Sequence, residues 1–143
     1  MDNIPTTDKF IAVLNKKIPT GNLMNAIGHM SVGLVTLFED LKPLRLQTYI
    51  DKSGTEHKNI SDNPYIVLKA DNSNQIRTLR NMLIEKNIKF VDFINTMTEG
   101  TFVEQHKRTN ETPEAELEYF GICFFMDGVE SRELTKKFSL FNS

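Results

Sequence analysis

Three polar residues on one predicted helix have the types and spacing that chemistry requires. Asn22, Asn25 and His29 are three and four residues apart, so in a helix their side chains lie on one face. Amides donate and accept hydrogen bonds, and an imidazole titrates near neutral pH. The spacing therefore predicts a polar, ligand-binding face. The alternative is a histidine that only hydrogen-bonds a nearby backbone group.

Basic and small residues come directly before this face. Lys16 and Lys17 lie in a predicted loop, Thr20 is a predicted N-cap, and Gly21 opens the helix. Cations near a helix N-terminus oppose the macrodipole unless an anion lies between them. In open α/β sheets, ligands also bind where a strand leads into a helix N-terminus. We therefore expect a phosphate or carboxylate here; two solvated lysines are the alternative.

A second polar group follows a later predicted strand. Asn95 ends that strand, and we expect it near the same edge of the sheet, where it and His29 are candidate catalytic residues. Glu99 is the carboxylate closest to the group and is a candidate base. A helix cap or first-turn acid is the alternative role for Glu99.

Other chemistries find no support in the sequence. His57 and His106 lack metal-ligand spacing with each other and with His29, and Cys123 is the single cysteine, so neither a disulfide nor a cysteine metal cluster can form within the chain. Cys123 lies in an apolar run and is interpreted as a buried small hydrophobe. No phosphate-binding loop, dinucleotide fingerprint or nucleophile elbow is present. We expect no metal and no cofactor.

Composition bounds the remaining possibilities. The chain has 143 residues, 39% of them hydrophobic, and a net charge of −2, which fits one globular domain and does not favour a nucleic-acid partner. We expect a short tail at 1–8 and a single domain at 9–143. Residues 1–8 show no signal-peptide pattern, and the apolar stretch 23–38 is interrupted and too short to span a bilayer. We therefore expect a cytoplasmic protein without a membrane partner.

The hydrophobic pattern predicts the elements that position these residues. A continuous apolar run predicts an internal strand, and alternating residues predict a half-exposed strand with a hairpin partner. Strands are expected at 9–15, 44–51, 57–61, 65–70, 89–94, 116–126 and 138–141, and helices at 21–41, after 71–74, around 102–103 and at 129–136. We expect a mobile loop at 107–113. The order predicts a three-layer α/β/α domain with a mixed sheet of roughly four to six strands.

Within this order, the chain resembles the peptidyl-tRNA hydrolase type II-like superfamily. An apolar strand and short loop lead to Gly21-Asn-Leu-Met-Asn-Ala-Ile-Gly-His29, where Gly21 and His29 match that family's Gly and His. A strand ending at Lys69-Ala70, the segment Phe93-Ile-Asn95 and a strand with Gly121 follow in the family's order. More closely, the chain resembles a branch described only as a domain of unknown function. The resemblance implies the fold and association into homodimers.

The sequence also departs from the hydrolase pattern. The family's Lys after the Gly is Asn22, and its helix Gln is Ala26. The family's Asp-Ala-Gly segment falls on Asn95-Thr96-Met97. If that Lys and Asp carry the electrostatic and acid–base work, their loss predicts negligible peptidyl-tRNA hydrolysis.

Three hypotheses about function remain. The first, which we favour, is a non-catalytic module that binds a small anionic ligand through Lys16, Lys17, Asn22, Asn25 and His29. The second is a hydrolase of an ester-like bond in which His29 is the acid or base. The third is a homo-oligomeric interaction protein with a vestigial cleft. The sequence leaves open whether the protein is an enzyme.

Overall fold

A mixed five-stranded sheet forms the centre of the protein. The computed structural model describes residues 6–142. The strands of the sheet are β1 (Asp8–Asn15), β4 (Tyr65–Ala70), β5 (Phe90–Ile94), β6 (Tyr119–Asp127) and β7 (Ser139–Leu140). Their order across the sheet is β5-β6-β1-β4-β7; β1 and β4 are parallel and the other pairs are antiparallel. The α/β class and the mixed sheet are as predicted.

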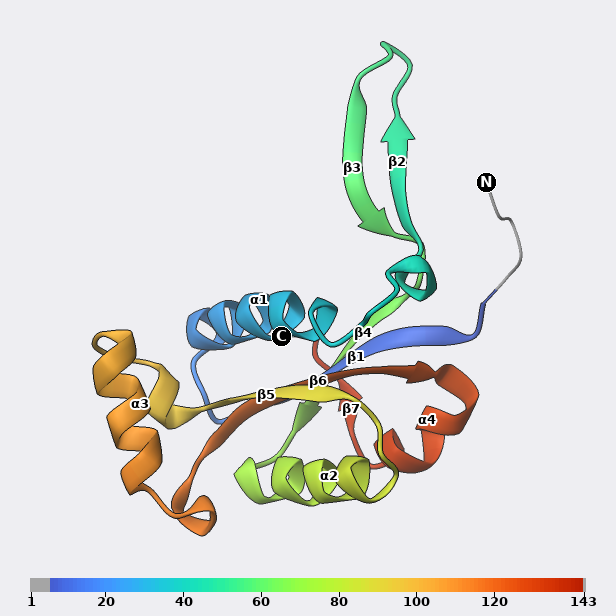
Figure 1. Cartoon of the computed structure of the whole chain (residues 1–143). Helices are drawn as coiled ribbons and strands as arrows, with labels where there is room; N and C mark the ends of the chain where they lie inside the picture. Colours follow the sequence, from blue (N-terminus) through green and yellow to red (C-terminus); the bar gives the residue numbers. More distant parts are fainter. Residues whose placement is uncertain (1–5, 143) are drawn as a thin grey trace.

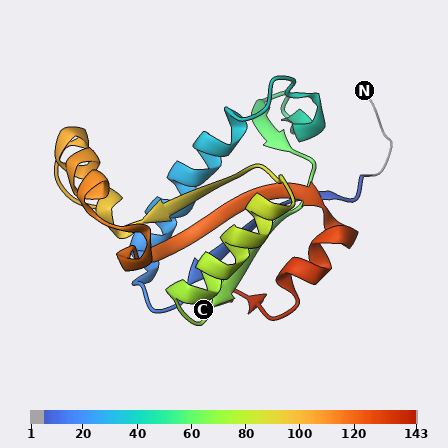
Figure 2. The ribbon, with the colours of Figure 1, turned by 60° about the horizontal axis from the view of Figure 1, so that its bottom comes forward.

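Helices cover both faces of this sheet (Figure 1). Helix α1 (Thr20–Val35) packs on one face, while α2 (Ser73–Glu85) and α4 (Gly128–Thr135) pack on the other. Helix α3 (Phe102–Glu111) lies beyond the end of β5, beside the sheet, as Figure 2 also shows. None of the helices within residues 6–142 combines the length and apolarity needed to cross a membrane.

Strand β1 is internal, as its apolar sequence predicts. It pairs with β4 on one side and β6 on the other, and residues 10–15 are all buried. Helix α1 covers β1 and β6 through Leu23, Ala26, Met30 and Leu34, which recur at helical spacing. Since these residues face the sheet, the flank of α1 that carries the polar side chains lies beside β5.

Two strands leave the body and form a separate hairpin. Strands β2 (Leu46–Ile50) and β3 (Glu56–Ser61) pair only with each other and project away from the sheet (Figure 1). We call this hairpin, 46–61, the arm. The predicted hairpin is confirmed, but the expectation that one face of its first strand is buried is wrong: four of the five residues of β2 are exposed.

Several predicted element boundaries are wrong. Helix α1 ends at Val35 rather than near residue 41, because the N–H of Thr36 bonds Gly33 O and tightens the last turn. Strand β6 begins at Tyr119 rather than residue 116, because a 3₁₀ turn precedes it. The mobile loop expected at 107–113 is mostly helical, since α3 continues to Glu111.

A capping box explains why α3 is a regular helix. The Thr101 side chain accepts a hydrogen bond from the Glu104 N–H, and the Glu104 carboxylate accepts one from the Thr101 N–H. These two bonds satisfy N–H groups that the first helical turn leaves unpaired. No residue of α3 is buried, so the helix has no apolar stripe by which a sequence pattern could reveal it.

Candidate functional site

The polar flank of α1 faces β5 and α3 across a shallow groove. Asn22, Asn25 and His29 are all exposed along this flank. The His29 ring lies on the Phe93 ring of β5, with 5.9 Å between ring centroids. The His29 ring has no hydrogen-bond partner among residues 6–142, whereas its backbone belongs to α1. The histidine is therefore open to a ligand instead of being enclosed against backbone.

Two adjoining hollows make up what we call the α1–β5 groove. One, of about 340 Å³, adjoins the start of α1, and the other, of about 520 Å³, adjoins its middle. Both are lined by Asn25, Phe93 and Thr98. Asn22 and Gly21 complete the first hollow, while His29 and Gln105 belong to the second. The structure thus brings Asn22, Asn25 and His29 to one groove of ligand size.

The floor of the groove is aromatic. The rings of Phe93 and Phe120 lie with centroids 5.8 Å apart beneath the polar rim. Beyond Gln105 and Met97 a third hollow of about 510 Å³ continues along α3. Gln105 carried no periodic or spacing signal, and the sequence-based site omitted it. An apolar floor with neutral donors above it suits an elongated organic ligand.

The rim of the groove carries no carboxylate side chain among the described residues. Asp92 is one of the lining residues, but side chains alternate along β5 and Phe93 occupies the groove side. The Asp92 carboxylate faces α2, where it accepts a hydrogen bond from Arg80 Nε at 2.8 Å. An anion in the groove therefore meets amide, hydroxyl and imidazole groups without an opposing negative charge.

The N-terminus of α1 opens onto the same groove without a side-chain cap. Pro19 precedes the first helical residue, so the expectation that Thr20 is the N-cap is wrong. The N–H groups of Asn22 and Leu23 both bond Pro19 O, whereas those of Thr20 and Gly21 have no partner among the described residues. The first turn also lacks an acidic residue. Partial positive charge consequently remains at this end of the helix.

Lys16 and Lys17 are not brought to the groove. Lys16 Nζ lies 2.8 Å from the Asp71 carboxylate, because the parallel pairing of Asn15 with Ala70 places the ends of β1 and β4 side by side. Lys17 lines a separate hollow of about 260 Å³ at the N-terminus of α2. The two lysines therefore contribute a long-range positive potential at most, and not a contact to a ligand beside Asn22.

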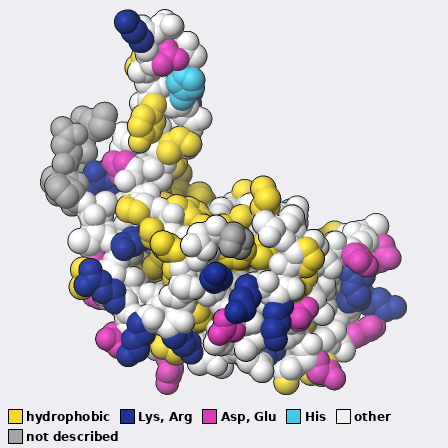
Figure 3. All heavy atoms as spheres, turned by 180° about the vertical axis from the view of Figure 1, so that it is seen from behind, with side chains coloured by type: hydrophobic (Ala, Val, Ile, Leu, Met, Phe, Trp, Pro, Cys, Tyr) yellow, Lys and Arg dark blue, Asp and Glu magenta, His cyan; other side chains and the backbone are white. Residues whose placement is uncertain are grey.

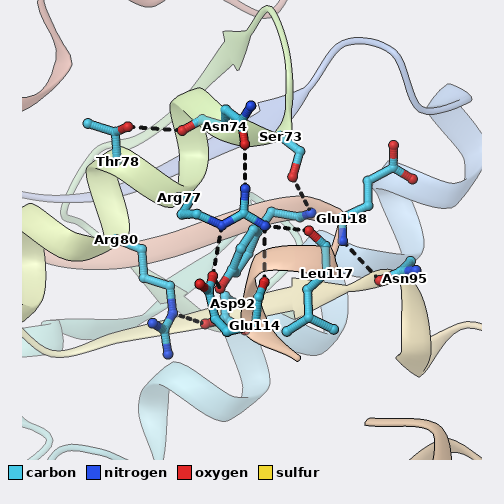
Figure 4. Close-up of polar contacts among 11 residues, drawn as sticks. Ser73, Asn74, Arg77, Thr78, Arg80, Asp92, Asn95, Glu114, Leu117 and Glu118 are labelled. Atoms are coloured by element: carbon cyan, nitrogen blue, oxygen red, sulfur yellow. Dashed lines mark hydrogen bonds and ion pairs between the residues drawn. The ribbon is translucent and has the colours of Figure 1, made fainter. Parts of the chain in front are cut away.

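Asn95 is engaged in the sheet instead of the groove. Its N–H donates to Glu118 O at 3.0 Å, and its Oδ1 accepts from the Glu118 N–H at 3.0 Å (Figure 4). The side chain thus extends the β5–β6 pairing by one step. Glu99 is exposed and does not line the groove, while its carbonyl accepts a hydrogen bond from Arg108. The predicted group of Asn95 and Glu99 therefore lies apart from the groove that Asn22, Asn25 and His29 line.

An ionic cluster next to Asn95 ties α2 to β6 (Figure 4). Arg77 Nε lies 2.8 Å from Glu114, and the Tyr119 hydroxyl donates to the same carboxylate at 2.8 Å. The Arg77 hydrogen bond holds the pKa of Glu114 below its usual range, and burial raises that of Tyr119 to about 12. Every member of the cluster has a partner inside the protein, which is the pattern of a structural anchor.

The chain matches, over residues 8–142, the model of a family described as protein of unknown function (DUF2000). It belongs to the DUF2000 family. A solved structure of a protein of unknown function, Atu0240 from Agrobacterium tumefaciens strain C58, is similar to it with a TM-score of 0.81 and 16% identity. The match covers 96% of this chain and 100% of that one. At this identity the likeness concerns the fold alone.

The comparisons assign no chemistry to the DUF2000 groove. A comparison with curated proteins found no match. The two matches do not link the DUF2000 fold to peptidyl-tRNA hydrolases, so that resemblance stays a hypothesis.

The remaining histidines and the cysteine of this DUF2000 protein lie elsewhere. His57 pairs with Asp51 in the arm at 2.8 Å, and His106 lies against Phe102 on α3. No cluster of three metal-ligating side chains occurs in the part of the chain that the structure describes. Cys123 is fully buried, and burial raises the pKa of its thiol to about 11, which suppresses the reactive thiolate.

Proposed function

We propose that this protein is a binding module for a small anionic ligand, held in the α1–β5 groove. The observation that carries the proposal is the uncapped N-terminus of α1, which opens onto a groove without a carboxylate side chain. In the proposed complex the anionic group accepts hydrogen bonds from the Thr20 and Gly21 N–H groups. Asn22 and Asn25 contact the adjoining part of the ligand, and His29 contacts its far end.

The dimensions of the site support this arrangement. His29 is two turns along α1 from Gly21, which corresponds to roughly 12 Å at the rise of an α-helix. One ligand that reaches both ends must therefore be an elongated organic anion with an apolar or aromatic middle over Phe93. The hollows of about 340 and 520 Å³ fall in the range of small-molecule sites.

A hydrolase that uses His29 is the second candidate, and the exposed position of the ring in the groove favours it. It is less well supported than binding, because a catalytic imidazole needs a group that orients it, and none bonds His29 among residues 6–142. A peptidyl-tRNA hydrolase type II-like fold, a cytoplasmic location and a homodimer complete the proposal. We expect no turnover of peptidyl-tRNA or simple esters, and a rate that His29→Ala abolishes would establish the second candidate.

Thermal unfolding with a panel of anions tests the binding proposal. The panel contains inorganic phosphate, citrate and aromatic phosphate and carboxylate compounds, each compared with chloride at equal ionic strength. Thr20→Asp places a carboxylate at the uncapped helix end, where it stabilises the unliganded protein by about 0.3–1 kcal/mol. It also repels the ligand, so the anion-dependent rise in Tm should disappear. Thr20→Asn has a similar size without the charge and should retain that rise.

Two further variants locate the ligand. Asn25→Leu removes the amide shared by both hollows and should reduce the anion-dependent rise in Tm. Ser31→Ala, on the opposite flank of α1, is the matched control and should not. A rise in Tm that persists in Thr20→Asp and Asn25→Leu would place the anion elsewhere and refute the proposed site.

A further inference from the structure

The arm exposes large apolar side chains that the rest of the described chain, residues 6–142, does not cover. Tyr49, Ile50 and Ile60 are 52%, 66% and 56% exposed, and Leu46 is also exposed. Gln47 pairs with Ile60, and Tyr49 lies two residues along β2, so Tyr49 and Ile60 share one face of the hairpin. A two-stranded hairpin is marginally stable in water unless another surface packs on it. The arm is therefore an element that requires a partner surface.

The body of the protein presents an apolar surface on the same side. Helix α1 packs on β1, β5 and β6, and beside it Tyr65 and Val67 of β4 stay partly exposed, although the Tyr65 hydroxyl is hydrogen-bonded to Ser31 of α1 at 2.7 Å. Ile27 and Phe141 are half-buried beside them, and Met24 is 68% exposed on the adjoining flank of α1. We call these five residues the body face. Figure 3 shows apolar side chains both on the arm and on the body beneath it.

Within residues 6–142, the arm is bonded to the rest of the protein at its base. Ser61 Oγ donates to Leu44 O at 2.5 Å, Arg45 Nε lies 2.6 Å from the Asp62 carboxylate, and Gln47 Nε2 donates to the same carboxylate at 3.3 Å. Farther out along the arm, β2 and β3 pair with each other in the part of the chain that the structure describes. Figure 1 shows the arm projecting away from the layers that α1 and the sheet form, so the arm and the body meet at a corner.

We infer that a second copy of this chain fills the corner, with the arm of each copy on the body face of the other. One chain carries both the projecting apolar arm and an apolar surface that an arm can cover. In a dimer with a two-fold axis, each arm therefore covers the body face of the other copy. Tyr49 and Ile60 lie on one face of the arm, so the apolar face that one copy exposes can lie on the body face that the other copy exposes. A standard interface buries roughly 800 Å² of each partner, so the dimer needs both of the contacts that the two-fold axis relates.

The groove proposed to bind an anion lies on the opposite flank of α1, facing β5. Association through the arm leaves that groove open, so this inference rests on the homodimer proposed above and does not depend on the anion site. The arm tip is charged by Asp51, Lys52, Glu56 and Lys58, and these residues form the polar rim of the interface.

Sedimentation of two single variants and of their mixture tests the inference. Ile60→Lys alters the arm and Met24→Glu alters the body face; each should weaken dimerisation about tenfold or more. Mixing the two variants should restore the dimer: one of its contacts is then native, and in the other the introduced lysine meets the introduced glutamate. Ile84→Lys, at a similarly exposed position on α2, is the control and should dimerise as the wild-type protein does.

Distinct outcomes would overturn the inference. A monomeric wild-type chain at high micromolar concentration would refute the inference. A dimer weakened by Ile60→Lys but unaffected by Met24→Glu would indicate pairing between two arms. Thermal unfolding of each variant verifies that it is folded, which we expect because both altered side chains are solvent-exposed.

Discussion

Gly121 is the position where one added methyl group should disturb both the core and the groove. A Cβ built on Gly121 would lie 2.8 Å from Leu14 Cδ2, 3.0 Å from Met30 Cε and 3.2 Å from the Val13 carbonyl oxygen. The two side-chain ends can move, but the carbonyl belongs to β1, which pairs directly with β6 at this point. Gly121→Ala must therefore displace the ends of the Leu14 and Met30 side chains, which pack between α1 and the sheet, and strain the β1–β6 pairing at Val13.

The expected loss of stability for Gly121→Ala is about 1–2 kcal/mol. Overpacking a close-packed core costs about 1–3 kcal/mol, and the reduced freedom of the unfolded chain returns about 0.4–1 kcal/mol. For a domain of this size each kcal/mol corresponds to a change in Tm of roughly 3–5 °C. Urea unfolding followed by circular dichroism measures the change in the free energy of unfolding.

Gly28→Ala is the matched control. Gly28 lies in the middle of α1, and a Cβ there would meet nothing within 4 Å. Alanine should stabilise the protein by about 0.8–1 kcal/mol through its helix propensity. We therefore expect the free energy of unfolding to fall in Gly121→Ala and to rise in Gly28→Ala. A Gly121→Ala variant as stable as the wild-type protein would refute the inferred contact between α1 and β6.

Three further outcomes are expected. Thr101→Ala removes the cap of α3, should cost about 1 kcal/mol, and should speed amide hydrogen exchange across 102–111 because that helix buries no residue. The Cys123 thiol, whose pKa burial raises to about 11, should react with a thiol reagent at pH 8 only after denaturation. Arg77 holds the pKa of Glu114 below its usual value of 4.5. The contact between them therefore stabilises the fold fully above pH 4.5, and this stabilisation is lost as the pH falls through the lowered pKa. Glu114→Gln should therefore destabilise the protein at neutral pH, with the difference from wild type in urea unfolding shrinking in acid.

The sequence predicted the parts of the fold that depend on local periodicity. The run from Phe10 to Leu14 is apolar at every position, and the structure places it in the middle of the sheet. The spacing of Asn22, Asn25 and His29 specified one helix flank in any tertiary fold. These predictions succeeded because a few consecutive residues carry the signal.

The positions that the sequence did not predict depend on contacts between residues far apart in the chain. Lys16 lies next to α1 in the chain, yet the register of β1 with β4 places it against Asp71. The amide oxygen of Asn95 accepts a hydrogen bond from the N–H of Glu118, 23 positions later and directly before β6. Phe120 and Gln105 reach the groove from β6 and α3, and no pattern in the chain connects them to α1. These contacts follow from strand order, which residue spacing does not encode.

The base of the arm has a consequence for engineering. The N–H of Asp62 donates to Arg45 O at 3.0 Å, so the chain enters and leaves the arm at nearly the same point. No residue of 46–61 is buried in the core. Excising the arm and closing the gap with a short turn should therefore leave the sheet and its helices intact. The same junction is a natural place to insert a foreign peptide or a complete domain, since its ends already meet.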